Sequence, residues 1–275
     1  MIITVIHNLY KNNPHIEQSI KLNLRALQDA DVDFQYIIFN DNGDVDLIKQ
    51  TKSIQAVLKQ TRQNSIEYYY SPINYGHKKC SGGWVGAVKE GLVKGDIIHN
   101  IGQDDIMTSL FYRKAKETFD NPDYYFFTAN AFKVNEQLIP LEIMLPPNQE
   151  VIYEDPIAHF KYWFGIIDGK VTRANNFFLA PGTMYRTELH DKIGLPDLDN
   201  FAGASDFEYW ARILFYGYKG KYFSLPSWYY RISPYSAGNE IIEGKQNLEY
   251  WLKLNLKAIQ DKYTHLVQQQ PDKFK

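Results

Sequence analysis

Two adjacent carboxylates, Asp104 and Asp105, are the residues of this sequence that point most directly to chemistry. They stand in Gly102-Gln103-Asp104-Asp105, directly after the apolar run 97–101, which is typical of a buried strand. In an open α/β sheet, ligands bind beyond the carboxyl ends of the strands. Two carboxylates at such a place can hold Mn²⁺ or Mg²⁺ against a phosphate. The residues alone leave open a second interpretation, an acidic turn in front of the next helix.

A third carboxylate, Asp206, precedes the segment 207–215, whose apolar spacing predicts a helix. A carboxylate at a helix start can act as a general base that takes the proton of an attacking hydroxyl. The structural alternative is a helix start, because Ser205 and Glu208 have the spacing of a capping box and acidic residues are favourable in the first turn. Both can hold, since Ser205 and Glu208 would cap the helix and leave Asp206 to point elsewhere.

Composition excludes several classes of protein. The chain has 275 residues, 44% of them hydrophobic, and a formal net charge of -2. A nucleic-acid-binding protein would usually show a basic stripe, so we expect no nucleic-acid partner. The single cysteine, Cys80, cannot form an internal disulfide, which favours a reducing compartment. With no run of about 18 apolar residues and no signal-peptide pattern, we expect a cytoplasmic protein, and peripheral attachment to the inner face of a membrane stays open.

The elements that must position the carboxylates alternate between strand and helix periods, as in a sheet with crossover helices. Strands are predicted at 2–6, 34–39, 66–70, 97–101 and 124–127. Asn13-Pro14 is typical of an N-cap followed by proline at the first helical position. Helices are predicted over 16–27, over 47–58 with a weaker pattern, and from Trp84 to an end at Gly95. The turn-rich sequence 40–43 closes the second strand.

The segment 137–175 interrupts this alternation with four prolines and one short helical pattern, at 157–166. Long irregular insertions in compact domains are usually functional, so we expect a lid or an acceptor-binding loop there. Regular structure then returns at 177–180, followed by the helix 207–215, the segment 221–230 and an amphipathic C-terminal helix at 248–266. The absence of a linker predicts a single domain over residues 1–275.

Taken in order, these motifs resemble the family 2 glycosyltransferases, which have the GT-A fold. The matches in the first half are the strand and helix at 4–20, Phe39-Asn40-Asp41, Asn74 with Gly76, Lys94-Gly95-Asp96, and Gly102-Gln103-Asp104-Asp105 at the family's Asp-x-Asp-Asp signature. The second half is more specific: Gly182 to Arg186, Ile193-Gly194, Ser205-Asp206 through Arg212 to 217–219, and Tyr230-Arg231 with Ser236. Their order and spacing carry the resemblance, which covers most of the chain.

Two positions depart from the family's pattern. Lys11 stands where the family often has Asn after the aromatic residue of its first strand. Gly102 replaces the first Asp of the metal signature, which removes one carboxylate. We therefore expect a metal to bind more weakly or more dynamically than in the family.

The resemblance implies an α/β fold of the GT-A type, with a mixed, mostly parallel central sheet flanked by helices, a less regular C-terminal acceptor-side region and a C-terminal helix. It divides the domain into a nucleotide-binding half at 1–105, an acceptor-side half at 106–240 and the helix at 241–275. It also implies an activity: inverting, metal-dependent transfer of a hexose or N-acetylhexosamine, as in polysaccharide biosynthesis. The donor would be a nucleotide-diphosphate sugar, expected to be UDP-linked, and the acceptor a hydroxyl of a glycan or of a lipid-linked molecule.

The same resemblance gives roles to individual residues. Asp104 and Asp105 would lie at the metal and the donor ribose, with Asp105 as the more direct ligand of Mn²⁺ or Mg²⁺. Asp206 would be the general base. The remaining positions would contact the donor: Asp41 at the base, with an Asx turn as its alternative, Asn40 beside it, Asn74, Gly76, and Arg231 at the phosphate oxygens.

Two alternatives remain at this stage. A sugar nucleotidyltransferase is also α/β, but it would open with a glycine-rich loop after the first strand, and the segment 7–11 contains no glycine. A non-catalytic protein that binds a nucleotide sugar or a glycan with the same fold is the other, and Gly102 is its best support. The sequence leaves the sugar, the acceptor, the linkage position and the oligomeric state open.

Overall fold

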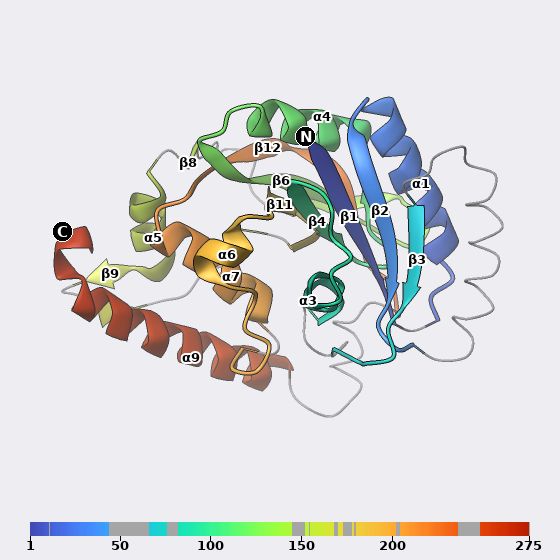
Figure 1. The fold of residues 1–275 in the computed structure, drawn as a ribbon. Coiled ribbons are helices and arrows are strands. Elements are labelled where there is room, and N and C mark those ends of the chain that lie inside the picture. Colours follow the sequence, from blue (N-terminus) through green and yellow to red (C-terminus); the bar gives the residue numbers. More distant parts are fainter. Residues whose placement is uncertain are drawn as a thin grey trace.

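In the part of the chain that the structure describes, ten strands form a central sheet with helices on both faces (Figure 1). The structure is a computed structural model. It describes residues 1–10, 12–43, 66–75, 82–144, 152–153, 155–167, 170–172, 178, 180–201, 204–235 and 248–274. The predicted helix at 47–58 lies outside these residues. The predicted α/β architecture, a central sheet flanked by helices, is confirmed.

The first part of the sheet is parallel and sets up one functional edge. Its strands are β1 (Ile2–Leu9), β2 (Asp33–Asn40), β3 (Ile66–Tyr70) and β4 (Ile97–Ile101), in the spatial order β3-β2-β1-β4. All three pairings are parallel. Parallel strands end at the same edge of a sheet, so the residues that follow these strands meet there.

The second part of the sheet mixes both directions. β11 (Thr183–Arg186) is antiparallel to β4 and to β6 (Tyr124–Val134), and β6 is parallel to β12 (Lys219–Arg231). Short strands pair antiparallel at the margins: β5 (Ile106–Met107) and β8 (Ile152–Tyr153) with β12, and β7 (Pro140–Ile143) with β6. A separate hairpin is formed by β9 (Ile166–Ile167) and β10 (Lys170–Val171). The long pairings are the parallel ones, which gives the mixed, mostly parallel sheet that we expected.

Alternating side chains of the strands feed two hydrophobic cores, because successive residues of a strand point to opposite faces. Ile38 packs with α1 (Ile16–Asp29) and α4 (Ser109–Phe119). Ile37, its neighbour, faces the other core. The helices of that core are α3 (Gly82–Lys89), α5 (Pro156–Phe164), α6 (Leu189–Ile193), α7 (Ser205–Phe215) and α9 (Leu248–Gln269), with η3 (Pro271–Phe274) at the end of the chain. Figure 1 shows α9 running beneath α7.

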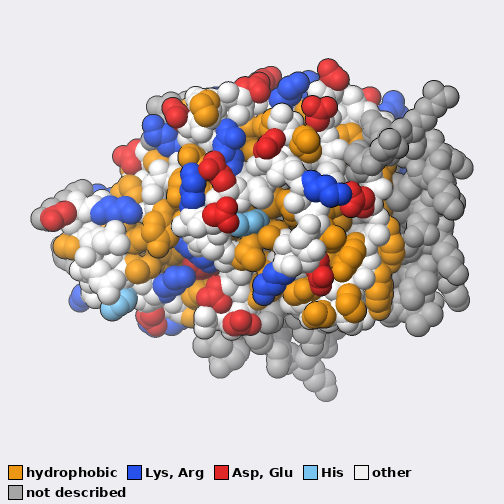
Figure 2. Space-filling view, in the orientation of Figure 1, with side chains coloured by type: hydrophobic (Ala, Val, Ile, Leu, Met, Phe, Trp, Pro, Cys, Tyr) orange, Lys and Arg blue, Asp and Glu red, His pale blue; other side chains and the backbone are white. Residues whose placement is uncertain are grey.

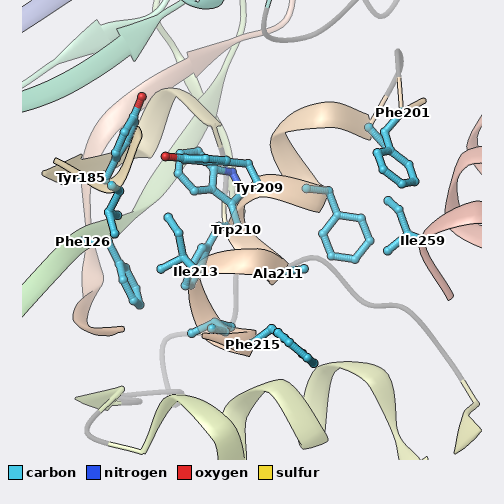
Figure 3. Packing of buried hydrophobic residues seen from close by; sticks show 14 of the residues in the cluster. Phe126, Tyr185, Phe201, Tyr209, Trp210, Ala211, Ile213, Phe215 and Ile259 are labelled. Carbon is cyan, nitrogen blue, oxygen red and sulfur yellow. The ribbon is translucent and has the colours of Figure 1, made fainter. Parts of the chain in front are cut away.

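Aromatic side chains fill the core around α7 (Figure 3). Trp210 of α7 stacks on Trp84 of α3 with ring centroids 5.6 Å apart. Phe207, one turn earlier, stacks on Phe164 of α5 at 6.0 Å. Aromatic pairs of this kind stabilise beyond the area that they bury. Much of the high aromatic content of the sequence therefore serves this core, and α7 is fixed between α3 and α5.

Three local expectations are wrong. The third helix ends at Lys89 and not near Gly95, because Gly91 adopts φ +68, the left-handed conformation that terminates helices. The N-cap expected at Asn13, with Pro14 as the first helical residue, is not seen either, because α1 begins at Ile16 and His15 is its N-cap residue. The capping box at α7 is not formed as predicted: Ala204, and not Ser205, is the N-cap residue, and it makes no side-chain cap bond.

Candidate active site

The acidic pair lies in the short loop between β4 and β5, and α1 anchors that loop. Both carboxylates are buried. Oδ2 of Asp104 accepts hydrogen bonds from the Asn13 amide and the Ser233 hydroxyl, each at 3.2 Å. The backbone carbonyl of Asp105 accepts from Ser19 Oγ at 2.5 Å and from the Nδ2 amide of α1's Asn23 at 2.9 Å. Side chains before and within α1, together with one after β12, therefore fix the loop.

The arrangement of the acidic loop explains why position 102 is a glycine. Its N–H donates to Oδ2 of Asp105 at 3.2 Å, so the carboxylate folds back over the glycine. A Cβ atom at position 102 would lie 2.6 Å from that same oxygen, closer than real Cβ contacts allow. An aspartate at position 102, as in the family signature, would therefore require the Asp105 carboxylate to move.

Charge at the site is partly balanced by Arg231, which is buried at the end of β12. Burial and then the neighbouring Asp104 raise the pKa of Asp105 well above its ordinary value, while the Gly102 N–H and the charge of Arg231 act in the opposite direction. Burial lowers the pKa of Arg231, and the two aspartates oppose that change. Nη2 of Arg231 donates to Oε1 of Gln18 at 2.8 Å. The structure thus brings Asp104, Asp105 and Arg231 close enough for their charges to act on one another.

The donor atoms of the pair suit a hard divalent cation that completes its shell with other ligands. Two carboxylates come from one loop, and carboxylate oxygen is what Mg²⁺ and Mn²⁺ prefer. Within the described ranges, no group of three or more His, Cys, Asp and Glu side chains is placed to hold a metal. Asp104 and Asp105 are thus the two adjacent carboxylates that this loop could offer to a cation.

At the end of β2, Asn40 and Asp41 do different things. Asn40 closes the turn, because its Oδ1 accepts from the Gly43 N–H at 2.7 Å while its Nδ2 donates to the Tyr68 hydroxyl at 3.1 Å. Oδ1 of Asp41 accepts from the backbone N–H of Tyr75 at 2.7 Å, across the sheet edge. The Asx-type turn thus belongs to Asn40, and Asp41 holds the loop after β3. Their predicted contacts with a nucleotide stay predictions.

Asn74 and Gly76 were both predicted on the donor side. Asn74 is exposed and lines a cavity of about 280 Å³ together with Lys89 and the segment 195–199. The lining of this cavity does not include the acidic pair. Because Tyr75 is bonded to Asp41, the Asn74 loop nevertheless belongs to the same sheet edge. Gly76 lies outside the described residues.

Asp206 is the second residue of α7 and is only partly covered by its surroundings. Its Oδ1 accepts from the Phe207 N–H at 2.8 Å. Desolvation raises the pKa of Asp206, and backbone N–H groups act against that rise. A carboxyl with a raised pKa is better matched to proton transfer near neutral pH than an ordinary aspartate.

Asp206 shares a face of α7 with the residues that pack on α3. Tyr209 and Trp210 follow it by three and four residues, on the same face of the helix. Both rings contact Trp84 in the first turn of α3, at 5.5 Å and 5.6 Å between centroids. Next to Trp84, the Cα of Gly83 lies against the Asn8 side chain near the end of β1. No described hydrogen bond or ion pair joins Asp206 to the acidic pair.

Comparison with known proteins bears on the fold. No family model and no curated protein matches the sequence. Solved structures do match. Staphylococcus aureus TarS, residues 1–349, in complex with UDP is 15% identical, with a TM-score of 0.55 over 94% of this chain and 71% of that one. The same fragment with UDP-GlcNAc is 14% identical, with a TM-score of 0.57 over 94% and 72% of the two chains.

An archaeal enzyme is equally similar. The mannosyltransferase PcManGT from Pyrobaculum calidifontis, in complex with GDP-Man and Mn²⁺, is 13% identical, with a TM-score of 0.57 over 96% of this chain and 70% of that one. The chain has the GT-A fold of glycosyltransferases. At these identities the likeness concerns the fold, and it confirms the fold that the sequence motifs implied.

Three residues of the site edge were missed by the sequence analysis. Asn13 was expected to be the N-cap of the first helix, but α1 begins at Ile16 and His15 is its N-cap residue. Asn13 Oδ1 accepts from the His15 N–H at 2.9 Å, and its Nδ2 donates to Asp104. Ser233 gave no sequence signal, because only the chain path after β12 brings it to Asp104. Asn8 donates to Asn100 Oδ1 and to the Ile101 carbonyl, tying the ends of β1 and β4. A polar residue at the end of a buried strand was the available signal for Asn8.

The described surface carries charges of both signs. Figure 2 shows Lys and Arg side chains interspersed with Asp and Glu over the described part of this face. No described helix is long and apolar enough to cross a membrane.

Proposed function

We propose that this chain is an inverting, metal-dependent glycosyltransferase that moves a sugar from a nucleotide-diphosphate donor to an acceptor hydroxyl. The observation that carries the proposal is the buried acidic pair, Asp104 and Asp105, beside Arg231 at the carboxyl edge of a GT-A sheet. Ligands of such sheets bind at that edge. The similar structures, which hold UDP, UDP-GlcNAc, or GDP-Man with Mn²⁺, support a nucleotide sugar as the donor.

The donor half of the proposed reaction depends on charge. Asp104 and Asp105 would hold Mn²⁺ or Mg²⁺, which neutralises the diphosphate as the anomeric C–O bond breaks. Arg231 would add positive charge next to the leaving diphosphate. Asp41 and the Asn74 loop that it holds would contact the nucleotide, with Gly76 continuing that loop and Asn40 keeping the turn after β2 in shape.

The acceptor half depends on Asp206. Its carboxylate would take the proton of the acceptor hydroxyl, whose oxygen attacks the anomeric carbon from the side opposite the leaving diphosphate. One C–O bond forms as the other breaks, so the configuration at the anomeric carbon inverts. The raised pKa of Asp206 supports this role, and so does the packing of α7 on α3 through Trp210 and Trp84.

The finer specificity belongs to the same proposal. We favour a UDP-linked hexose or N-acetylhexosamine as the donor, and a glycan or a lipid-linked acceptor. The acceptor side would comprise residues 106–240, and the nucleotide side residues 1–105. We place the enzyme in the cytoplasm, with the inner face of a membrane as the site where a lipid-linked acceptor would be met.

The experiment that tests the proposal is calorimetry of UDP binding with and without Mn²⁺, on the wild type and on Asp105→Ala. We expect Mn²⁺ to tighten UDP binding to the wild type and to have no effect on the variant. Unchanged affinity and an unchanged response to Mn²⁺ in Asp105→Ala would show that the metal site is misassigned. Proton NMR of the product then tests the stereochemistry, since inversion turns an α-linked donor into a β-linked product.

A second candidate function is a non-catalytic nucleotide-sugar-binding protein with the same fold. Gly102 favours it, because the Asp105 carboxylate folds back over the glycine where the family carries a further carboxylate. The two functions differ in one measurement. An enzyme of this class should slowly hydrolyse its sugar donor in the presence of Mn²⁺, whereas a binding protein should leave the donor intact.

A further inference from the structure

Glu208 is a fully buried carboxylate on α7, two residues after Asp206. Its first partner is Arg212 of the same helix, which donates from Nε to Oε1 at 3.1 Å and from Nη2 to Oε2. Arg212 also donates from Nη1 to the carbonyls of Ile193 at 2.6 Å and Leu195 at 3.1 Å. A buried carboxylate persists only when it is paired and hydrogen-bonded. The first turns of α7 are therefore tied to the chain that follows α6.

The C-terminal helix α9 supplies the other partners of Glu208. Lys262 Nζ lies 2.7 Å from Oε1 of Glu208, and the Tyr263 hydroxyl donates to the same oxygen at 3.1 Å. The Tyr263 hydroxyl also lies 3.2 Å from the backbone carbonyl of Glu208. The Tyr263 ring is buried against Phe160 and Phe215, with centroids 5.1 Å and 5.5 Å away. Two adjacent residues of α9 thus hold one side chain of α7.

Lys262 also reaches the chain on the other side of Asp206. Its ammonium lies 5.0 Å from the centroid of the Phe201 ring, within cation–π range. The carbonyl of Phe201 accepts from the N–H of Ala204, the residue just before α7. Figure 3 shows Phe201 and Ile259 on the side of α7 that faces α9. One lysine therefore contacts the chain before Asp206, at Phe201, and after it, at Glu208.

The start of α7 depends on these contacts because it lacks a local one. Ala204, the N-cap residue, has no side chain that could accept from the first N–H groups. The Asp206 carboxylate accepts from the N–H of its neighbour Phe207 and interacts with its own backbone N–H. In a helix without a side-chain cap, tertiary contacts fix the direction of the first turn. Here the polar tertiary contacts of that turn converge on Glu208.

We infer that Lys262 and Tyr263 of the C-terminal helix are positioning residues for the general base. Through Glu208 they hold the first turn of α7, and so the Asp206 carboxylate, in the orientation that proton transfer requires. This inference rests on the proposed function, because it takes Asp206 to be the base. It gives α9 a part in catalysis although no described contact joins this helix to the acidic pair.

The test uses the full chain and three single variants. Lys262→Met removes the ammonium and keeps an apolar stem over Phe201. We expect kcat for transfer to fall by roughly tenfold to a hundredfold, as small misplacements of a reacting group do. UDP affinity by calorimetry should stay unchanged, because the donor contacts are elsewhere. Lys262→Arg keeps the charge and should recover most of the lost kcat. The matched control is Lys257→Met, which removes an exposed lysine that pairs with Asp261 on the same helix and should behave as the wild type.

Amide hydrogen exchange separates positioning from general stability. In Lys262→Met the amides of 205–209 should exchange faster, while those of β1 and β4 should not change. An unchanged kcat in Lys262→Met would overturn the inference, as would a loss of kcat in strict proportion to the fraction of unfolded protein. Two other failures have different signatures. If Asp206 is not the base, Asp206→Asn retains full turnover, and if the proposed function fails, the wild type shows no transfer.

Discussion

A catalytic role and a purely structural role of Asp206 predict different results when this residue is replaced. Its pKa is raised by burial, so the carboxylate must lose its proton at a pH above the ordinary aspartate value of about 3.9 before it can act as a base. We expect kcat to increase with pH through the raised pKa of Asp206. Asp206→Asn should lower kcat by about 10² to 10⁴-fold and remove this dependence. A pH profile of kcat on both proteins measures the effect, and full transfer by the variant would exclude Asp206 from the mechanism.

The same shift has a consequence for stability, with a definite sign. Because the pKa of Asp206 is higher in the folded protein than in the unfolded chain, its favourable contribution is complete below the unfolded value and is lost as the pH rises through the folded value. Asp206→Asn should therefore be more stable than the wild type at pH 7 to 8. The difference should vanish below about pH 4. Urea unfolding at several pH values tests this, and a less stable variant at pH 8 would contradict it.

Gly102 allows a test of the geometry of the acidic loop. A Cβ there would lie 2.6 Å from Oδ2 of Asp105, so even Gly102→Ala must displace that carboxylate from the Gly102 N–H. We expect a loss of roughly 1 to 3 kcal/mol in the free energy of unfolding, as for other overpacked sites. Gly91→Ala provides a comparison without a clash. Gly91 has open space where a Cβ would lie, so alanine there is strained only by the φ of +68. A metal-free unfolding curve for Gly102→Ala equal to that of the wild type would disprove the clash.

The sequence indicated the charged residues of the site and missed the neutral ones. Asp104, Asp105 and Arg231 were predicted, because carboxylates after a buried strand and the Tyr-Arg pair are visible in one dimension. Ser233 was not, since its place beside Asp104 depends on how the chain turns after β12. The capping box at Ser205 failed for a similar reason, because Glu208 bonds to another helix that is more than fifty residues away.

At the scale of elements, we expect the contact between α3 and α7, made by Trp84 and Trp210, to position the helix that carries Asp206. Trp210 is buried and stacks on Trp84. Trp210→Ala should cost about 3 to 5 kcal/mol of unfolding free energy and lower turnover even where the protein remains folded. Tyr216→Ala is the control: Tyr216 ends the same helix and is exposed, so its loss should stay within about 0.5 kcal/mol. Equal losses of unfolding free energy and turnover in the two variants would show that the contact between α3 and α7 does not position α7.

The elements that the sequence predicted are those with a strong local period. β3 and β4 have the predicted bounds of 66–70 and 97–101, and α7 was found because its apolar residues face one core. No bounds were predicted for α4 and β5 from the sequence. Thr108 caps α4 by accepting from the Phe111 N–H at 3.4 Å, but the interpretation of this region considered only the acidic loop in front of it. β7 was overlooked because its residues are exposed and their pairing with β6 is a long-range event.

For the molecule as a whole, buried histidines predict sensitivity to acid. His7 of β1, His99 of β4 and His190 of α6 each have a pKa lowered to about 4, with burial as the main cause. The unfolded chain takes up these protons near pH 6.5, whereas the folded protein does so only near pH 4. Stability from these groups is complete above about pH 6.5 and is lost as the pH falls toward 4. The raised pKa values of Asp105 and Asp206 act in the opposite direction over part of this range.

Comparing variants isolates the histidine contribution from the opposing aspartates. His190 is the best choice, because it lies near the surface and its Nε2 is 2.8 Å from the Tyr185 hydroxyl, a contact that glutamine can keep. Between pH 7 and pH 5 the wild type should lose roughly 2 kcal/mol more unfolding free energy than His190→Gln. His265→Gln is the control variant, because it makes the same substitution at an exposed position of α9. The prediction is contradicted if the unfolding free energy of all three proteins depends on pH in the same way. His190 would then be protonated in the folded protein at pH 5, which requires water to reach its ring beside Tyr185 and Tyr209.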